Sequence, residues 1–257
     1  MRFLPLASGS RGNATLVEFG STRLLVDAGL SARGLKERLS RVGLEPSALD
    51  AILLTHEHLD HARGAARLSK LHGIPVICAH ETLDALDCSP AHLAAWQPLD
   101  AGRVLDLGAV AIEPFPVPHD AARPVGYVLH GEGLRVGIAT DLGHATTLVI
   151  ERLRRCDLVM IESNHDDRML LDGPYPWHVK QRVQGRLGHL SNHEAAAVLR
   201  ETVGDACRAV VLAHLSESNN RPALVRRIAG AALVQAGTTR VDPRIAVAGG
   251  PTPAVHM

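Results

Sequence analysis

Aromatic side chains are scarce in this chain, and their scarcity limits the surfaces it can offer. Phe, Trp and Tyr together make up 3% of the 257 residues. A nucleic-acid surface built on many stacked rings is therefore not expected. Net charge is missing as well, because Lys+Arg and Asp+Glu number 27 each. The composition thus predicts no overall attraction to nucleic acid or to an anionic membrane, although a local basic patch remains open.

Long apolar runs and paired cysteines are also absent from the sequence. No stretch approaches the ~20 apolar residues of a membrane span, and the opening MRFLPLASGSRGN has no apolar core of a signal peptide. No C-x-x-C spacing occurs among the four cysteines, which we expect to be small buried residues: Cys78, Cys88, Cys156 and Cys207. These features predict a cytoplasmic protein without a membrane partner.

Short apolar runs alternate with helix-forming segments along the whole chain. Strands are predicted at 2–6, 14–19, 22–27, 51–54, 75–78, 103–106, 110–117, 125–130, 135–140, 158–161, 209–213 and 244–248. Helices are predicted at 31–42, 61–71, 82–86, 145–154, 167–171, 177–187, 191–202 and 222–230. Two groups of strands with helices outside them indicate an α/β fold, a four-layer αββα sandwich. We expect one domain over residues 1–257, with a mobile tail after residue 248.

Histidine is abundant, with 15 residues, and the densest group directly follows a predicted buried strand. The segment T-H-E-H-L-D-H begins at Thr55. In an extended segment His56 and His58 point to the same side. The chain then turns into a helix, so that Asp60 and His61 can face a second point. Such a concentration of ligand groups is stabilised by metal ions, and imidazole with carboxylate suits zinc, iron or manganese.

This motif resembles that of the metallo-β-lactamase superfamily, whose sites lie at one edge of an αββα sandwich. Later segments match the family in the expected order: P-F-P-V-P-H-D with His119, A-T-D-L-G with Asp141, and V-V-L-A-H-L-S with His214. The resemblance implies two divalent metal ions per chain. One is expected on His56, His58 and His119, the other on Asp60, His61 and His214, with Asp141 shared by both.

Two such metals, roughly 3.5–4 Å apart, can share a water molecule and lower its pKa toward ~7. The resulting metal-bridged hydroxide would attack an electrophile while the metals stabilise charge on the transferred group. Asp60 and Asp141 are accordingly expected to serve catalysis as well as metal binding. The sequence does not identify the groups that orient the histidines.

The segment G-H-L-S-N-H-E-A-A contains His189 and is similar to the H-S-T-x-x-x-A segment of ribonuclease Z. In that family the histidine is thought to protonate the leaving oxygen, and the resemblance implies the same role here. The role is chemically sensible, because breaking a phosphodiester expels an alkoxide that an imidazolium can protonate. A structural position near the start of the next helix is the competing interpretation.

The segment from Glu162 to Lys180, with S-G-S-R-G-N and D-A-G-L-S-A-R-G-L, resembles the YycJ/WalJ (VicX) group. That group implies 5′→3′ exonuclease action on DNA and a part in mismatch repair. Asn164, His165 and Asp166 are then candidate substrate contacts, with a polar loop as an equal alternative.

Two weaker candidates for phosphate contact remain. The turn from Ser10 to Asn13 could present backbone N–H groups to a phosphate, although an ordinary hairpin turn explains it as well. Arg182 and Arg186 could grip DNA locally, although a solvated helix face explains their charge. The chain departs from related nucleases, because it has no inserted segment like that of β-CASP nucleases and no exosite arm like that of ribonuclease Z.

The sequence therefore predicts a dinuclear-metal-dependent phosphodiesterase, a nuclease acting on DNA. One alternative is hydrolysis of a small ester, lactone, thioester or cyclic phosphodiester. Another is a non-catalytic regulator that binds a partner, which the intact set of ligands disfavours. The metal, the polarity of cleavage and the choice between monomer and homodimer stay open.

Overall fold

The computed structural model describes residues 1–86, 89–238 and 240–257, so the prediction for Cys88 lies outside the described residues. The chain forms two compact units. Unit 1 comprises Met1–Pro114, Ala121–Val125 and Val247–Met257. Unit 2 comprises Phe115–Asp120 and Gly126–Ala246. None of the described helices is long and apolar enough to cross a membrane.

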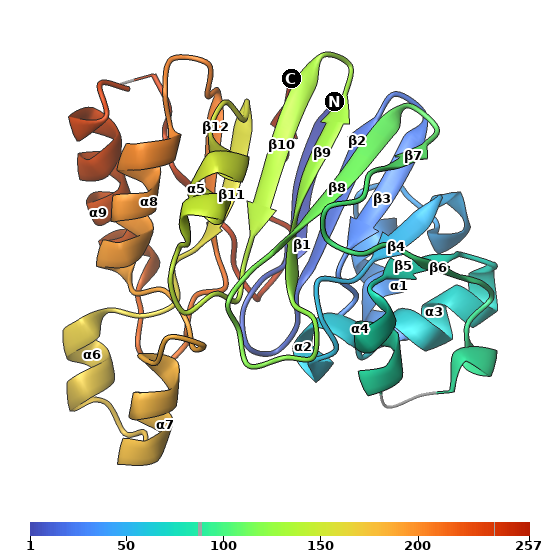
Figure 1. Ribbon diagram of the computed structural model, residues 1–257, viewed down its shortest axis with the longest axis horizontal. Helices are drawn as coiled ribbons and strands as arrows, with labels where there is room; N and C mark the ends of the chain where they lie inside the picture. The colour runs from blue at the N-terminus through green and yellow to red at the C-terminus, as the bar shows by residue number, and fades with distance from the viewer. Residues whose placement is uncertain (87–88, 239) are drawn as a thin grey trace. The chain divides into compact units, whose positions relative to one another are not determined.

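The first sheet has seven strands in the order β14-β1-β2-β3-β4-β5-β6 (Figure 1). Their bounds are β1 Arg2–Ala7, β2 Ala14–Phe19, β3 Thr22–Val26, β4 Ala51–Leu53, β5 Val76–Cys78, β6 Trp96–Pro98 and β14 Val255–His256. The pairs β1–β2 and β2–β3 are antiparallel, whereas β3, β4, β5 and β6 run parallel. The carboxyl ends of β3 and β4 therefore lie at the same edge of the sheet.

Helices α1 (Ala32–Ser40) and α3 (Ala65–His72) bury their apolar sides in the core of unit 1. Leu35 and Leu68 are fully buried in that core. The side chain of Ser31 caps α1 by accepting from the Gly34 N–H, as the sequence predicts. The remaining short helices of this unit are η1 Pro46–Ala48, α2 Leu59–Ala62, α4 His80–Ala85 and η2 Pro90–His92.

The second sheet has seven strands in the order β13-β12-β11-β10-β9-β8-β7. Their bounds are β7 Leu105–Leu107, β8 Val110–Pro116, β9 Val125–Gly131, β10 Leu134–Ala139, β11 Leu158–Glu162, β12 Ala209–Ala213 and β13 Arg244–Ile245. Strands β10 to β13 run parallel. Because β10, β11 and β12 are neighbours with the same direction, the residues that follow them gather at one edge.

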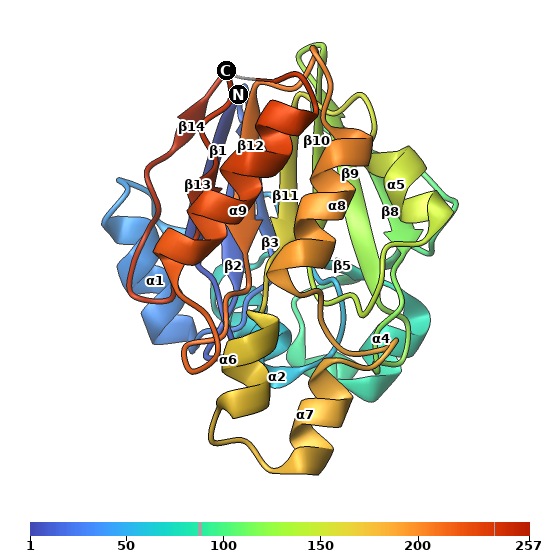
Figure 2. The same ribbon diagram turned by 90° about the vertical axis from the view of Figure 1, so that its left-hand side faces the viewer.

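Helices α5 (Thr147–Leu153), α8 (Asn192–Thr202) and α9 (Pro222–Gln235) pack on one face of the strands of unit 2, where Figure 2 shows α8 and α9 side by side. Ser191 and Glu194 form a capping box at the start of α8. Two shorter helices, α6 (Asp167–Asp172) and α7 (Trp177–Val183), follow β11.

Three expectations from the sequence were wrong in detail. The helix expected at 61–71 is two helices, because the Gly64 N–H donates to the Ala28 carbonyl at 2.8 Å and so leaves the helical hydrogen-bond pattern. The close approach needs glycine, since a Cβ at Gly64 would lie 2.2 Å from the Leu30 carbonyl oxygen. Strand β6 was not predicted. The tail expected to be mobile instead pairs with β1 through Val255 and His256, so backbone hydrogen bonds hold it to the sheet.

Candidate metal centre

The T-H-E-H-L-D-H segment follows β4 in unit 1. His56 and His58 lie in the extended stretch before α2, whereas Asp60 and His61 belong to the helix. The ring centroids of His56 and His58 are 4.6 Å apart, and those of His56 and His61 are 4.2 Å apart. The turn therefore gathers three imidazoles and one carboxylate, as the spacing predicts.

Asp27 orients two of these histidines and was not singled out from the sequence. Its carboxylate, buried at the end of β3, accepts from His61 Nδ1 at 2.8 Å and from the Thr55 hydroxyl at 3.0 Å. That hydroxyl then accepts from His56 Nδ1 at 3.0 Å. A carboxylate only accepts, so the proton of His61 must be on Nδ1, and the lone pair is left on Nε2.

Asn13 braces the same turn from the β1–β2 connection. Its backbone N–H donates to the Asp60 carbonyl at 2.7 Å, and its side-chain amide donates to His61 Nε2 at 2.9 Å. Asn13 is buried, and its side-chain oxygen accepts from the Gly9 N–H. The structure thus makes Asn13 a support of the histidine turn, while Ser10 lies exposed at the tip of the loop. Phosphate contact by either residue stays a prediction.

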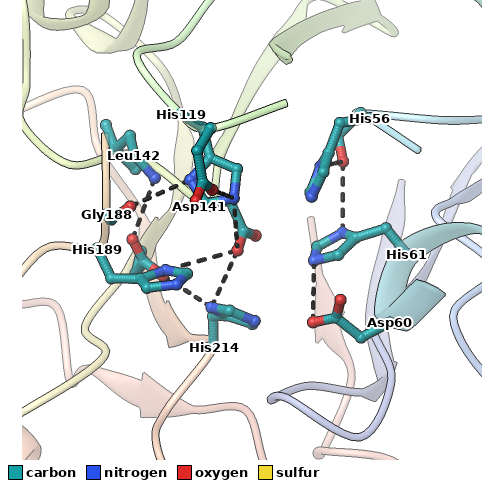
Figure 3. Close-up of polar contacts among 12 residues, drawn as sticks. His56, Asp60, His61, His119, Asp141, Leu142, Gly188, His189 and His214 are labelled. Atoms are coloured by element: carbon teal, nitrogen blue, oxygen red, sulfur yellow. Dashed lines mark hydrogen bonds and ion pairs between the residues drawn. The ribbon is translucent and has the colours of Figure 1, made fainter. Parts of the chain in front are cut away.

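In unit 2 three histidines surround the carboxylate of Asp141, as Figure 3 shows. Its Oδ1 lies 3.3 Å from His214 Nδ1, 3.6 Å from His189 Nδ1 and 3.9 Å from His119 Nε2. Asp141 follows β10 and His214 follows β12, each with a left-handed φ of 56°. The parallel strands thus bring together residues that are far apart in the sequence.

Glu162, the last residue of β11, is the main site residue that sequence reasoning missed. Its side chain is fully buried, and Oε1 accepts from His189 Nδ1 at 2.8 Å and from His214 Nδ1 at 2.7 Å. Its Oε2 accepts from the backbone N–H groups of Leu142 and Leu190. A run of four apolar residues before it was the only signal in the sequence. Because its two oxygens accept four hydrogen bonds, the carboxylate of Glu162 is held in place and can orient the two histidines.

The electrostatics of unit 2 follow from these contacts. Burial alone would raise the pKa of Glu162, but the charge and hydrogen bonds of His189 and His214 lower it to about 2. Burial alone would lower the pKa of His189, but the charge of Glu162 and its hydrogen bond raise it overall. Burial lowers the pKa of His119 despite the nearby charge of Asp141. His189 therefore carries a proton more readily than His119 does.

The loop after α7 holds the site together. The Gly188 carbonyl accepts from His119 Nδ1 at 3.1 Å. A Cβ at Gly188 would lie 2.2 Å from the Arg182 carbonyl oxygen, and one at Gly143 would lie 2.3 Å from that of Arg186. This close backbone approach requires glycine at both positions. The loop thus fixes His119 and the segment after Asp141 at the same time.

The donor set in unit 2 fits a divalent metal ion. Ligand atoms of Asp141, Glu162, His189 and His214 all lie within 4.8 Å of one another. The Nδ1 atoms of His119 and His214 face oxygen acceptors, which leaves Nε2 as the coordinating nitrogen. Metal-binding histidines are typically held in this way. Imidazole with carboxylate suits zinc, iron or manganese and does not distinguish them.

The other predicted contacts have different surroundings. Asn164 is buried and donates to the His214 carbonyl, and His165 is buried beside Ser191, where burial lowers its pKa. Asp166 caps α6. Their contacts favour a supporting role, and substrate binding by these three residues stays a prediction. Arg182 is exposed and donates to Asp120, and this hydrogen bond raises the pKa of Arg182.

Comparison with known proteins agrees with this geometry. The chain matches the model of the beta-lactamase superfamily domain over residues 22–215. It is 34% identical over 243 residues to exodeoxyribonuclease YycJ of Bacillus anthracis, a match that covers 92% of this chain and 90% of that protein. It is 35% identical over 224 residues to exodeoxyribonuclease WalJ of Streptococcus pneumoniae strain D39, covering 84% and 81%.

A solved structure of another protein has a similar fold. The metallo-beta-lactamase fold protein YhfI of Bacillus subtilis superposes with a TM-score of 0.74 at 18% identity, covering 98% of this chain and 99% of that one. The predicted fold class, an αββα sandwich, is confirmed by this likeness and by the family model.

Proposed function

The chain belongs to the metallo-β-lactamase superfamily, and from that premise we propose that it is a metal-dependent exonuclease that hydrolyses DNA phosphodiesters. Its similarity over most of its length to proteins named exodeoxyribonucleases supports the choice of substrate. The observation that carries the proposal is the buried Glu162 that holds His189 beside Asp141, because it pairs a proton donor with metal ligands.

We propose that the two units act as one hydrolase domain and jointly hold two divalent cations. Imidazoles and Asp60 from unit 1 would join His119, Asp141 and His214 from unit 2. Such cations activate water and neutralise charge on a phosphate. The chain's part is to fix the ligands: Asp27 holds the tautomer of His61, and Glu162 holds that of His214.

His189 is proposed to protonate the leaving oxygen of the cleaved ester. Its Nδ1–H is engaged by Glu162, so Nε2 is the nitrogen that would deliver a proton. Its side chain is 22% exposed, against 3% for His214, so it is the more accessible of the two to substrate. The raised pKa of His189 keeps more of it protonated near neutral pH, which suits an acid for an alkoxide leaving group.

The first test compares the wild type with Asp141→Ala on 5′-labelled double-stranded DNA, with Mn²⁺ or Zn²⁺ added and bound metal quantified. We expect degradation by the wild type only, with release of the labelled terminal nucleotide if it acts from the 5′ end and stepwise shortening of the labelled strand if it acts from the 3′ end. Parallel arms with RNA and with a chromogenic ester separate a nuclease from a small-molecule hydrolase. If the wild type leaves DNA intact and Asp141→Ala behaves identically, the proposal fails.

We also propose that the protein works in the reducing cytoplasm and takes part in DNA repair. The three cysteines in the described part of the chain are free and buried, which suits a reducing compartment: Cys78, Cys156 and Cys207. A role in repair would require preference for nicked or mismatched duplexes, which the same assay can measure by comparing such substrates with intact DNA.

A further inference from the structure

Trp177 has an unusual position among the few aromatic residues of this chain. Of the seven Phe, Trp and Tyr residues, the structure fully buries Phe3, Phe19, Phe115 and Tyr127. Trp96 and Tyr175 are half-buried. Trp177 is 63% exposed, although full burial of such a ring would be strongly favourable. Trp177 is thus the most exposed aromatic ring of the chain, and an exposed ring face is a surface on which a base can stack.

The helix that carries Trp177 is anchored to the site. Helix α7 ends at Val183, whose carbonyl accepts from the His189 N–H at 2.9 Å. The ammonium group of Lys180 donates to the Leu171 carbonyl and so ties α7 to α6. Val179 and Val183 are half-buried on the side of α7 that faces the protein. Any ligand of Trp177 is therefore held in fixed relation to His189.

The charge around α7 favours a polyanion. Residues 168–189 contain four basic side chains and one acidic one, whereas the whole chain is neutral. Arg182 and Arg186 are exposed on α7 and on the loop that follows it. Arg182 is held by Asp120 at 2.7 Å, next to His119. Positive charge beside an exposed ring is the combination with which proteins bind single-stranded nucleic acid.

We propose that Trp177 stacks on an unpaired base of the strand being cut, so that α7 holds the strand while its phosphodiester lies at the site. This inference rests on the proposed nuclease function. An exonuclease separates the terminal nucleotides of its substrate, which exposes base faces to such a ring. Stacking needs no particular base, so the contact would add affinity for unpaired ends without sequence preference.

The binding experiment uses the whole chain in EDTA, so that nothing is cleaved. In a Trp96→Phe background Trp177 is the only tryptophan, and we expect 5′-phosphorylated oligothymidylate to quench its fluorescence. The affinities of the variants are compared through the fluorescence anisotropy of a fluorescein-labelled oligothymidylate, because replacing Trp177 removes the tryptophan signal. Trp177→Leu keeps an apolar side chain without an aromatic face and should weaken binding by about 5- to 150-fold, the range of one lost base stack. Trp177→Phe should restore most of it. Val234→Ala, another exposed apolar position in unit 2, is the matched control and should bind like the wild type.

A second readout separates this inference from the proposed function. With metal added, Trp177→Leu should raise KM for DNA and leave hydrolysis of bis(4-nitrophenyl) phosphate unchanged. If the wild type cleaves neither substrate, the nuclease proposal fails, and the fluorescence experiment still decides on stacking. Equal oligothymidylate affinity for wild type and Trp177→Leu overturns the inference. The inference is also overturned if light scattering shows a dimer for the wild type and a monomer for Trp177→Leu, because the ring would then contact a second copy of the chain.

Discussion

His189 and His214 donate to the same carboxylate oxygen, Oε1 of Glu162, at 2.8 and 2.7 Å. One buried carboxylate thus sets the tautomer of a candidate metal ligand and of a candidate proton donor. Its other oxygen is held by two backbone N–H groups, so the carboxylate cannot rotate without losing them. The two histidines are therefore linked mechanically as well as electrostatically.

Replacing the Glu162 carboxylate should weaken both metal binding and catalysis. In Glu162→Gln the amide N–H₂ must face either two histidine donors or two backbone donors, so one side loses its acceptor. We expect activity and metal affinity to fall by about 10- to 100-fold, as for other groups that orient metal ligands. Activity at saturating metal and zinc binding at limiting metal give the two readouts. Glu201→Gln, an exposed position on α8, is the control and should change neither.

Glu162 should also make the metal-free protein sensitive to acid. Its pKa is lowered from 4.5 to about 2, so its charged form stabilises the folded state. That stability is fully present above the unfolded pKa near 4.5 and is lost as the pH falls toward 2. Urea unfolding in EDTA should show the difference between wild type and Glu162→Gln shrinking from pH 6 to pH 3. A difference that does not change with pH would contradict this.

The fold and the ligands were predictable from sequence for a simple reason. Apolar runs with their turns mark β4, β10 and β12, and the chain places His56, Asp141 and His214 within three residues of the ends of those strands. Burial of a strand and exposure of its end are local properties that a single sequence carries. A motif with three histidines and one aspartate indicates metal binding and fits few other functions.

The supporting groups could not be predicted in the same way. Asp27 and Glu162 also end strands, but their partners lie 34 and 27 residues away, in His61 and His189. The parallel pairing of β3 with β4 brings Asp27 to His61, whereas the loop after α7 brings His189 to Glu162. For Asn13 the turn rich in glycine and serine predicts either a phosphate contact or an ordinary hairpin turn, and it does not indicate the contacts of its amide with Gly9 and His61. The partners of Asp27, Glu162 and Asn13 are set by long-range contacts, which a single sequence does not reveal.

Asp27→Asn tests the histidine turn of unit 1 separately. Asp27 has a left-handed φ of 62°, a conformation that Asn tolerates well, so the backbone should be preserved. The amide keeps one acceptor where Asp27 uses both oxygens for Thr55 and His61. We expect zinc at the site that includes His61 to bind about 10- to 100-fold more weakly. Dialysis against limiting zinc should lower the bound metal from about two ions per chain toward about one. Unchanged stoichiometry would show that His61 does not depend on Asp27.

The thiol of Cys207 should resist alkylation in the native protein. Burial raises its pKa to about 11, and the thiolate is the reactive form. At pH 8 iodoacetamide should therefore modify Cys207 far more slowly than in urea, and raising the pH to 9 should speed the modification about tenfold, because the pH is still below the pKa of the thiol. Mass spectrometry of digested protein measures the extent at this residue. Rapid modification at pH 8 in the folded state would mean that the segment opens readily.

Gly188→Ala should disturb the site without touching a ligand. The added methyl group would lie 2.2 Å from the carbonyl oxygens of Arg182 and Val183, which are backbone atoms and cannot swing aside. The loop must then move, and with it the carbonyl that holds His119. We expect a loss of about 1–3 kcal/mol in stability, typical of overpacking, together with weaker metal binding. Zinc binding and urea unfolding measure both effects.

Gly230→Ala in α9 provides the matched substitution for Gly188→Ala. No atom lies within 4 Å of a Cβ built at Gly230, and the residue is helical, so the same methyl group should stabilise the protein by about 0.5–1 kcal/mol. If the same substitution destabilises the protein at Gly188 and stabilises it at Gly230, the loss at Gly188 comes from the close approach of the neighbouring backbone and not from the loss of glycine as such. If Gly188→Ala binds zinc like the wild type, the Gly188 carbonyl does not position His119, and the ring must be fixed by its contact with Asp141 instead.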